Sequence, residues 1–395
     1  MQKTYNTSHV RKINQRAVLD SIMHHGSISK AELARQMGLS KPAMADNVQS
    51  LLELGLVCEG GEGNSGPVGG RKPIMLSLNA GYKYIVTIDF FYTFSSFMLV
   101  NLKGEVVEKF SINQTPAQSF EAWMEMSVNA VNTLLFSQAV RNEDVAAIGI
   151  SAPGVVGGKE NIASAMSGEF DTAIFVKRLR KVFGCEVYTK NSANVYAVAE
   201  AVYGAGIGYD NILYISCGEG IGAGILLEGR LYEGSGMAAG EIGNFVTRQS
   251  MNEPTRLEER LCIDEFLNHI RKNAPEKTLK KLNLNNNNRE LFQQVVDVWK
   301  KGDDFLEKSV EELAYEIGCV AADMSMLLNC DVVIIGGEYI VFGEQTVPII
   351  QKIVTERCYL PAKVVLAQLG REGRGLGMMT LCREFYFDKV CGLVE

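Results

Sequence analysis

The segment NILYISCGEGIGAGILLEGRLY, residues 211–232, contains two apolar runs separated by a glycine-rich turn, with a second turn at Glu228-Gly229-Arg230. Apolar runs bounded by glycines are typical of β-hairpins. A similar pattern occurs earlier, where strands are predicted at 84–89 and 96–101 and a turn at Lys103-Gly104. Helical patterns follow each of these two β-units. We therefore predict a duplicated α/β body.

Other apolar segments of the body fit this interpretation. Short buried strands are expected at 145–150, 186–189 and 332–335. A long helix with one apolar face is expected at 309–329. The run of four asparagines at 285–288 predicts a surface loop.

The first 80 residues carry a different pattern, which begins with three short helices. The first is predicted at 11–22, from its amphipathic spacing. The second follows the N-cap Ser29, and the third follows the N-cap Ser40 and ends near Leu54. A short turn containing Gly38 separates the second helix from the third, which is the spacing of a helix-turn-helix.

Two short strands, at 56–59 and 74–78, follow the third helix and flank a glycine-rich loop that ends in Arg71-Lys72-Pro73. This pattern indicates a wing whose basic tip can reach phosphates or a minor groove. We call residues 1–80 the head and the remainder the body.

The third helix of a helix-turn-helix enters the major groove of DNA. The residues that we expect to contact DNA are Ser40, Lys41, Met44, Asn47 and Gln49 on this helix and Arg71 and Lys72 in the wing. Any three-helix bundle shows similar caps, so a purely structural bundle is the alternative. The turn, the spacing and the basic wing together favour DNA binding.

Charge is divided unevenly between the head and the body. Residues 1–80 contain nine Lys/Arg and six Asp/Glu, a net charge of +3, whereas the whole chain carries −7, which leaves −10 on the body. A weakly basic head favours contact with nucleic acid through the head alone. Chance variation of a few charges would explain the same numbers.

Composition excludes several other classes of protein. The 395 residues, 47% hydrophobic and 22% charged, suit two or three globular domains. No apolar stretch reaches the roughly 18 residues of a membrane helix, so we expect a cytoplasmic protein with no membrane partner. The nine scattered cysteines suit reduced thiols. Three of the four histidines lie within the first 25 residues, which leaves the body poorly supplied for histidine-dependent catalysis.

Several motifs occur in a fixed order along the body. They are Ala152-Pro153-Gly154-Val155, Asn191-Ser192-Ala193-Asn194 with Glu200, Gly220-Ile221-Gly222-Ala223-Gly224-Ile225, Gly234, Ala239-Gly240-Glu241-Ile242-Gly243 and Ile335-Gly336-Gly337. This set resembles the motifs of the ROK family of sugar kinases and sugar-responsive repressors, and the head resembles the winged helix of the repressor branch. An ordered set of motifs is far more specific than a lone glycine loop.

The resemblance implies an α/β fold: an N-terminal winged helix-turn-helix and a two-lobed, actin-like (ribonuclease H-like) body with its ligand in the interdomain cleft. We expect a DNA-binding domain at 1–80, a first lobe at 81–205 and a second lobe, with an oligomerisation surface, at 206–395. The positions that match the family's sugar-binding residues are Gly154, Asn191, Asn194, Glu241 and Asn244. For Asn191 and Asn194, loop and helix capping is an equal alternative.

Departures from the kinase motifs predict a body that does not catalyse phosphoryl transfer. The family's phosphate-binding D-x-G-G-T is Asp89 followed by Phe90-Phe91-Tyr92-Thr93, so bulky aromatic residues would fill that approach. The G-T-G of the second phosphate loop carries Glu219, a carboxylate that would repel a phosphate. The position of the family's catalytic aspartate holds Ser192, an alcohol unable to act as a general base alone.

No metal and no cofactor are expected. Family members that bind structural zinc use a histidine after G-E-I-G and three cysteines in a C-x-C-G-x-x-G-C run. Here Asn244 takes the place of that histidine, and residues 248–255 contain no cysteine.

The sequence therefore predicts a sugar-responsive transcriptional regulator, and we favour a repressor over an activator. Its expected partners are an operator in double-stranded DNA and a sugar or sugar-derivative effector. The chain is also expected to form a homodimer or homotetramer. One alternative is an active ATP-dependent sugar kinase with an accessory DNA-binding head. Another is a DNA-binding scaffold that binds no ligand. Ser192 and Glu219 argue against the kinase, and Glu241 argues against the ligand-blind scaffold.

Overall fold

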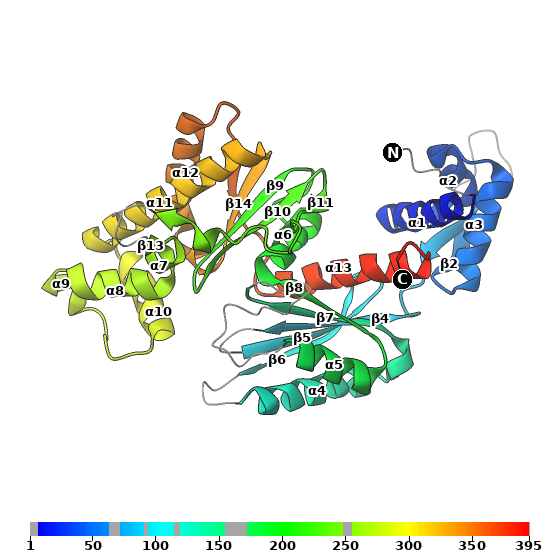
Figure 1. Ribbon diagram of the computed structural model, residues 1–395, viewed down its shortest axis with the longest axis horizontal. Helices are drawn as coiled ribbons and strands as arrows, with labels where there is room; N and C mark the ends of the chain where they lie inside the picture. The colour runs from blue at the N-terminus through cyan, green and yellow to red at the C-terminus, as the bar shows by residue number, and fades with distance from the viewer. Residues whose placement is uncertain are drawn as a thin grey trace. The chain divides into compact units, whose positions relative to one another are not determined.

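The computed structural model describes residues 7–62, 72–90, 94–113, 119–154, 172–247 and 255–394 (Figure 1). The chain divides into two units. The first comprises Met1–Ser151, Asp171–Thr189 and Met378–Glu395, and the second comprises Ala152–Phe170 and Lys190–Gly377.

The head belongs to the first unit and has the predicted winged-helix pattern. Its helices are α1 (Thr7–His25), α2 (Lys30–Met37) and α3 (Lys41–Glu53). Its three strands, β1 (Ile28–Ser29), β2 (Val57–Glu62) and β3 (Ile74–Leu78), form an antiparallel sheet in the order β1-β3-β2. The arrangement of these elements confirms the winged helix.

Side-chain caps and a small core explain why the head folds this way. Ser29 accepts a hydrogen bond from the backbone N–H of Glu32, and Ser40 accepts one from Ala43. Gly38 ends α2 with a φ of 63°, a left-handed conformation that favours glycine. Apolar residues at helical spacing fill the core, namely Val18, Leu19, Ile22, Leu33, Val48 and Leu51.

The rest of the first unit is a five-stranded sheet between helices. The strand order is β6-β5-β4-β7-β8, in which β4 is antiparallel to β5 and parallel to β7. The strands are β4 (Tyr84–Phe90), β5 (Phe94–Asn101), β6 (Val106–Asn113), β7 (Val145–Ala152) and β8 (Glu186–Asn191).

Helices cover both faces of this sheet. Figure 1 shows α4 (Phe120–Ser137) and α5 (Thr172–Phe183) on one face and the C-terminal helix α13 (Glu372–Val390) on the other. The rings of Phe90 and Trp123 pack edge to face on the α4 side, with centroids 4.7 Å apart. On the other face α13 lies so close to Gly149 of β7 that a Cβ there would meet Met378 and Cys382.

The second unit repeats the strand order of the first. Its sheet runs β11-β10-β9-β14-β15, with an antiparallel hairpin first and parallel strands after it. The strands are β9 (Ile212–Cys217), β10 (Ile221–Leu227), β11 (Arg230–Leu231), β14 (Val332–Gly336) and β15 (Lys363–Leu366). The duplication predicted from the two hairpins is therefore present as two sheets of one topology.

Helix α6 (Ser192–Tyr203) contacts one face of the second sheet, where Ala197 packs with Ile212 and Tyr214. Helices α11 (Asp304–Leu328) and α12 (Gly343–Arg357) pack in the larger apolar core of this unit. The smaller elements are α7 (Glu258–Leu261), α8 (Ile263–Asn273), α9 (Glu276–Leu279), α10 (Asn288–Trp299), the strands β12 (Val246–Thr247) and β13 (Thr255–Arg256), and the one-turn helices η1 (Asn142–Asp144), η2 (Ile242–Asn244) and η3 (Glu338–Phe342).

The expected first lobe, residues 81–205, is shared between the two units. Helix α6 packs on β10, where a Cβ at Gly224 would lie 2.5 Å from the carbonyl oxygen of Ala193. The division into domains at 1–80, 81–205 and 206–395 stays a prediction. We propose to refine it by placing α6 with the second lobe and the end of α13 with the first.

Candidate functional site

The exposed surface of α3 is the candidate DNA-binding surface of the head. Lys41 and Gln49 are exposed, and Ser40 is exposed while its hydroxyl caps the helix. Lys72 is exposed where the chain enters β3, and Arg71 lies outside the described residues. Contact of these exposed residues with DNA stays a prediction.

Two residues expected on this surface are in the core instead, which corrects the sequence-based expectation for them. Met44 is 1% exposed and Asn47 is 4% exposed, and the Asn47 amide donates to the Ala43 carbonyl oxygen at 2.8 Å. The reason is the helical period, because position 44 shares its face with the core residues 48 and 51. The stripe at 41, 45 and 49, spaced by four residues, is the exposed one.

In the second unit, hydrogen bonds of the Asn191 side chain join three residues that the sequence predicts to bind ligand. Asn191 is the N-cap of α6, and its side-chain oxygen accepts from the N–H groups of Ala193 and Asn194. Its amide nitrogen donates to the Gly154 carbonyl oxygen at 2.8 Å and to Glu241 Oε1 at 3.3 Å. The Asn191 side chain thus caps α6 and also contacts Gly154 and Glu241. We call Gly154, Asn191 and Glu241 the amide–carboxylate cluster.

The other two expected ligand residues lie in different environments. Asn194 is 1% exposed, and its side-chain oxygen has no hydrogen-bond partner among the described residues. Asn244 is exposed at the end of η2. Burying an amide oxygen without a hydrogen-bond partner costs stability. The Asn194 oxygen could therefore accept a hydrogen bond from a ligand.

The electrostatics of Glu241 differ from those of a surface carboxylate. Burial, and secondarily the charge of Glu258, raise the pKa of Glu241 above its usual value. Both causes disfavour the charged form. Glu258 itself accepts a hydrogen bond from the N–H of Ile221 at the start of β10.

An ion pair that sequence analysis missed supports the same cluster. Lys190 donates to the two carboxylate oxygens of Glu233 at 2.8 and 2.6 Å, and the two side chains are 7% and 21% exposed. Lys190 immediately precedes Asn191, and Glu233 begins the segment that leads to Glu241. The pair therefore joins two of the three chain segments of the amide–carboxylate cluster. Its adjacency to Asn191 was the only signal in the sequence.

The turn between β9 and β10, where the resemblance predicts the second phosphate loop, is acidic. The N–H of Glu219 donates to Glu338 Oε2 at 3.2 Å. Burial and the neighbouring charge of Glu338 raise the pKa of Glu219. Glu338 directly follows the predicted glycine pair Gly336-Gly337, but sequence analysis did not single it out. Glu219 and Glu338 therefore lie close together at this turn.

The aromatic replacements in the first hairpin are only partly described. Phe90 is 4% exposed and packs on Trp123, so its ring belongs to the core. The expectation that the aromatic residues fill a phosphate approach stays a prediction. Residues 91–93 lie outside the described residues. Ser192 is the first residue of α6, directly after the N-cap Asn191.

In the described ranges no group of three or more His, Cys, Asp or Glu side chains is placed to hold a metal ion. No helix within these ranges is both long and apolar enough to cross a membrane.

Curated relatives match most of the chain. The xylose repressor of Bacillus spizizenii is 25% identical over 386 residues, which cover 96% of this chain and 97% of that protein. The xylose repressor of Lactiplantibacillus pentosus is 27% identical over 337 residues, covering 85% and 83% of the two chains.

Solved structures show the same fold. A ROK family transcriptional regulator, a homolog of the E. coli MLC protein, superposes with a TM-score of 0.81 at 19% identity, covering 98% of each chain. A ROK family glucokinase from Streptomyces griseus, solved with glucose and AMPPNP, has a TM-score of 0.63 at 22% identity and covers 76% of this chain and 99% of its own.

Family sequence patterns agree with the two-part organisation. The MarR family pattern matches residues 12–62, within the head, and the ROK family pattern matches residues 85–384. Because the second match covers well over half of the chain, the protein belongs to the ROK family.

Proposed function

We propose that this protein is a DNA-binding transcriptional repressor that releases its operator when the body binds a sugar, and that the body does not phosphorylate that sugar. The observation that carries the proposal is the amide–carboxylate cluster in the same chain as a winged helix. The relatives named as xylose repressors, matched over almost their whole length, support it.

The chemistry of the cluster suits a polyol. The Glu241 carboxylate accepts hydrogen bonds from hydroxyl groups, and these charge-assisted bonds are stronger than neutral ones. The Asn191 amide donates, and the unpartnered Asn194 oxygen accepts. Since the relatives are named for xylose, an aldopentose is the first effector class to test.

The same region argues against phosphoryl transfer. A sugar kinase needs a base near the reacting hydroxyl and a phosphate site with donors or cations. Here Ser192 stands at the position of the base, and Glu219 and Glu338 place two carboxylates at the phosphate loop. A body that recognises a sugar without transferring phosphate can act as a sensor.

On the DNA side, we propose that Lys41 and Gln49 contact the operator, with Arg71 and Lys72 reaching the phosphates or the minor groove from the wing. A homodimer or homotetramer in the cytoplasm would place two heads on half-sites about one helical turn, or a multiple of it, apart. Lys41→Ala is expected to weaken binding to all sequences and to lower the salt slope by about one if Lys41 meets a phosphate.

The test measures the affinity of the full chain for DNA from upstream of its own and neighbouring genes, by fluorescence anisotropy, with and without xylose. Xylose is expected to weaken operator binding at least tenfold. Glu241→Gln should keep the sugar-free affinity and lose most of the response. Glu312→Gln, which changes an exposed carboxylate of α11, is the matched control and should respond like the wild type.

Two outcomes would contradict the proposal at different points. If no fragment binds even at low salt, the regulator function fails. If Glu241→Gln responds like the wild type to the sugar that releases the wild type, then Glu241 does not contact the effector.

A further inference from the structure

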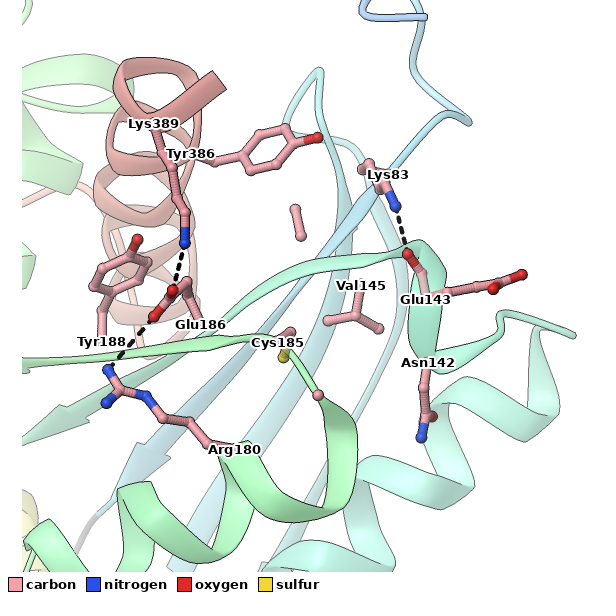
Figure 2. Close-up of a pocket in the computed structure, with 12 residues that line it drawn as sticks. Lys83, Asn142, Glu143, Val145, Arg180, Cys185, Glu186, Tyr188, Tyr386 and Lys389 are labelled. Carbon is pink, nitrogen blue, oxygen red and sulfur yellow. Dashed lines mark hydrogen bonds and ion pairs between the residues drawn. The ribbon is translucent and has the colours of Figure 1, made fainter. Parts of the chain in front are cut away.

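The first unit contains a pocket that the sugar site does not use. Its volume is about 570 Å³, and β7, β8, the end of α5, η1, α13 and the residue before β4 contribute to its walls. Val145, Ala146, Gly184 and Cys185 provide apolar surface, and Figure 2 shows the polar side chains around them. Pockets of this size hold small molecules.

Positive charge predominates in this pocket. Its lining includes three cations, Lys83, Arg180 and Lys389, against two carboxylates, Glu143 and Glu186. Glu186 forms ion pairs with two of the cations, with Lys389 Nζ at 2.5 Å and with Arg180 at 3.5 Å. The pocket is therefore suited to a ligand that carries negative charge.

Lys83 supplies the charge that is least compensated. Its ammonium donates to the backbone carbonyl oxygen of Glu143, as Figure 2 shows, and makes no ion pair with a carboxylate among the described residues. The Glu143 carboxylate instead pairs with Arg141. A carbonyl satisfies one donor of Lys83 without neutralising it. The charge of Lys83 helps to lower the pKa of the nearby Asp144 carboxyl, but that carboxylate pairs with Arg141, so donors of Lys83 remain for a ligand.

Two tyrosines add neutral donors to the same walls. Burial is the main cause that raises the pKa of Tyr188 and that of Tyr386 to about 12, so both hydroxyls keep their protons near neutral pH. Neither hydroxyl has a hydrogen-bond partner among the described residues. In Figure 2, Tyr386 extends from α13 towards the side of the pocket where Lys83 lies. Ammonium groups and phenols together are donors for carboxylate or phosphate oxygens.

Two of the three cations, Lys83 and Lys389, come from the segments that join the head to the body. Lys83 lies in the short link between β3 of the head and β4 of the body. Lys389 lies near the end of α13, and the same helix end binds α1 of the head. There Arg16, 9% exposed, donates to Asp388 at 2.7 Å, contacts Glu384 and lies over the Phe387 ring.

A second contact reinforces this connection, because Lys12 of α1 donates to the Gly392 carbonyl oxygen at 2.8 Å. The same end of α13 therefore carries two pocket residues, Tyr386 and Lys389. It also carries the three residues that contact Arg16 of the head, which are Glu384, Phe387 and Asp388. A ligand that draws Lys389 away from Glu186 acts on the helix turn that anchors α1.

We propose that this pocket binds a small organic anion, with a carboxylate or phosphate group between Lys83 and Lys389, and that the bound anion changes the DNA affinity of the head. The binding claim stands alone, whereas its effect on DNA rests on the proposed repressor function. A ligand changes DNA affinity in this way only if it binds one conformation of the protein more tightly than another.

The experiment titrates the full chain with succinate, glycerol phosphate and inorganic phosphate by calorimetry, with glycerol as the uncharged comparison. The key variant is Lys83→Gln, whose amide can still donate to the Glu143 carbonyl while the charge is removed. Lys103→Gln, an exposed lysine of the same unit outside the pocket, is the matched control. Comparison of succinate with the phosphates distinguishes the two anion chemistries.

Saturable binding of at least one anion is expected, weakened about tenfold in Lys83→Gln and unchanged in Lys103→Gln. Saturating anion should change operator affinity about fivefold in the wild type. Absence of saturable binding, or binding that Lys83→Gln leaves unchanged, overturns the site. Binding at the pocket with unchanged DNA affinity, in a protein that still binds DNA, overturns the coupling but not the repressor function.

Discussion

The two five-stranded sheets have one strand order, yet they differ where their first two strands meet. In the first sheet, β4 ends in Phe90, whose ring packs on Trp123, and the Trp123 indole donates to Ser95 of β5 at 3.0 Å. In the second, the turn between β9 and β10 carries Glu219 against Glu338. One architecture therefore accommodates an aromatic core contact in one unit and a pair of carboxylates in the other.

The sheets also differ in how a helix approaches them through a glycine. At Gly149 a Cβ would meet the side chains of Met378 and Cys382, at 2.5 and 2.6 Å. At Gly224 it would meet the carbonyl oxygen of Ala193 and the Cβ of Ala197, both at 2.5 Å. Side chains can change rotamer, whereas a helix backbone cannot move without its neighbours.

The largest expected effect is a loss of stability when each of the two glycines is replaced by alanine. Gly224→Ala should destabilise the protein by about 3 kcal/mol and Gly149→Ala by about 1 kcal/mol, the two ends of the usual range for overpacking. Urea unfolding followed by circular dichroism measures both. Equal losses would mean that the backbone of α6 yields as readily as the side chains of α13.

The next effect concerns the ion pairs of the two units. Lys190→Met leaves the partly buried Glu233 without its cation and should cost about 2 kcal/mol. Arg16→Met faces carboxylates that are 35% exposed or more, so we expect about 1 kcal/mol. Lys280→Met, from an exposed pair with Glu276, is the control and should change the free energy of unfolding by less than about 0.5 kcal/mol. A larger loss for Arg16→Met than for Lys190→Met would reverse the ranking.

Local signals in the sequence predicted the elements well. The caps Ser29 and Ser40 and the left-handed Gly38 define the head, and their hydrogen bonds are formed as expected. The two hairpins predicted the duplicated sheets because strand period and glycine turns are properties of neighbouring residues. The amide–carboxylate cluster was found through a resemblance that spans distant motifs.

Properties that depend on tertiary packing were not predictable in this way. Met44 and Asn47 look like suitable DNA contacts by residue type, but the packing of α3 on α1 and α2 decides which face is exposed. Glu338 lies 119 residues from Glu219, and nothing local indicates that they meet. The assignment of α6 to the second unit likewise follows from its contact with Gly224, which is formed only in the folded chain.

A smaller effect should appear as a pH dependence specific to the second unit. Since the pKa of Glu241 is raised, its carboxylate gains a proton at a higher pH than an exposed glutamate does. Ionisation of Glu241 therefore lowers the free energy of unfolding. This destabilisation disappears as the pH falls through the raised pKa and Glu241 becomes protonated. A protonated Glu241 accepts hydroxyl hydrogen bonds less strongly, so lowering the pH from 7 to 5 should weaken the sugar response about threefold.

The measurement is the xylose concentration that half-releases operator DNA, determined at several pH values. Glu241→Gln carries no titrating group at this position, so its residual response should not show this pH dependence. Glu312→Gln should show the wild-type profile. A pH profile shared by all three proteins would assign the effect to another group.

The smallest expected effect is none at all, and it concerns the base that Ser192 replaces. Ser192→Asp returns a carboxylate to the start of α6, yet Glu219 and Glu338 still repel the phosphates of a nucleotide. We expect no xylose-dependent ATP hydrolysis from the wild type or from Ser192→Asp, measured by a coupled assay able to detect far less than about one turnover per second. Because Ser192 adjoins the N-cap Asn191, an unchanged thermal unfolding curve must accompany the result. Turnover in Ser192→Asp alone would show that the acidic turn between β9 and β10 is no obstacle, and that the second unit departs from a kinase by one residue only.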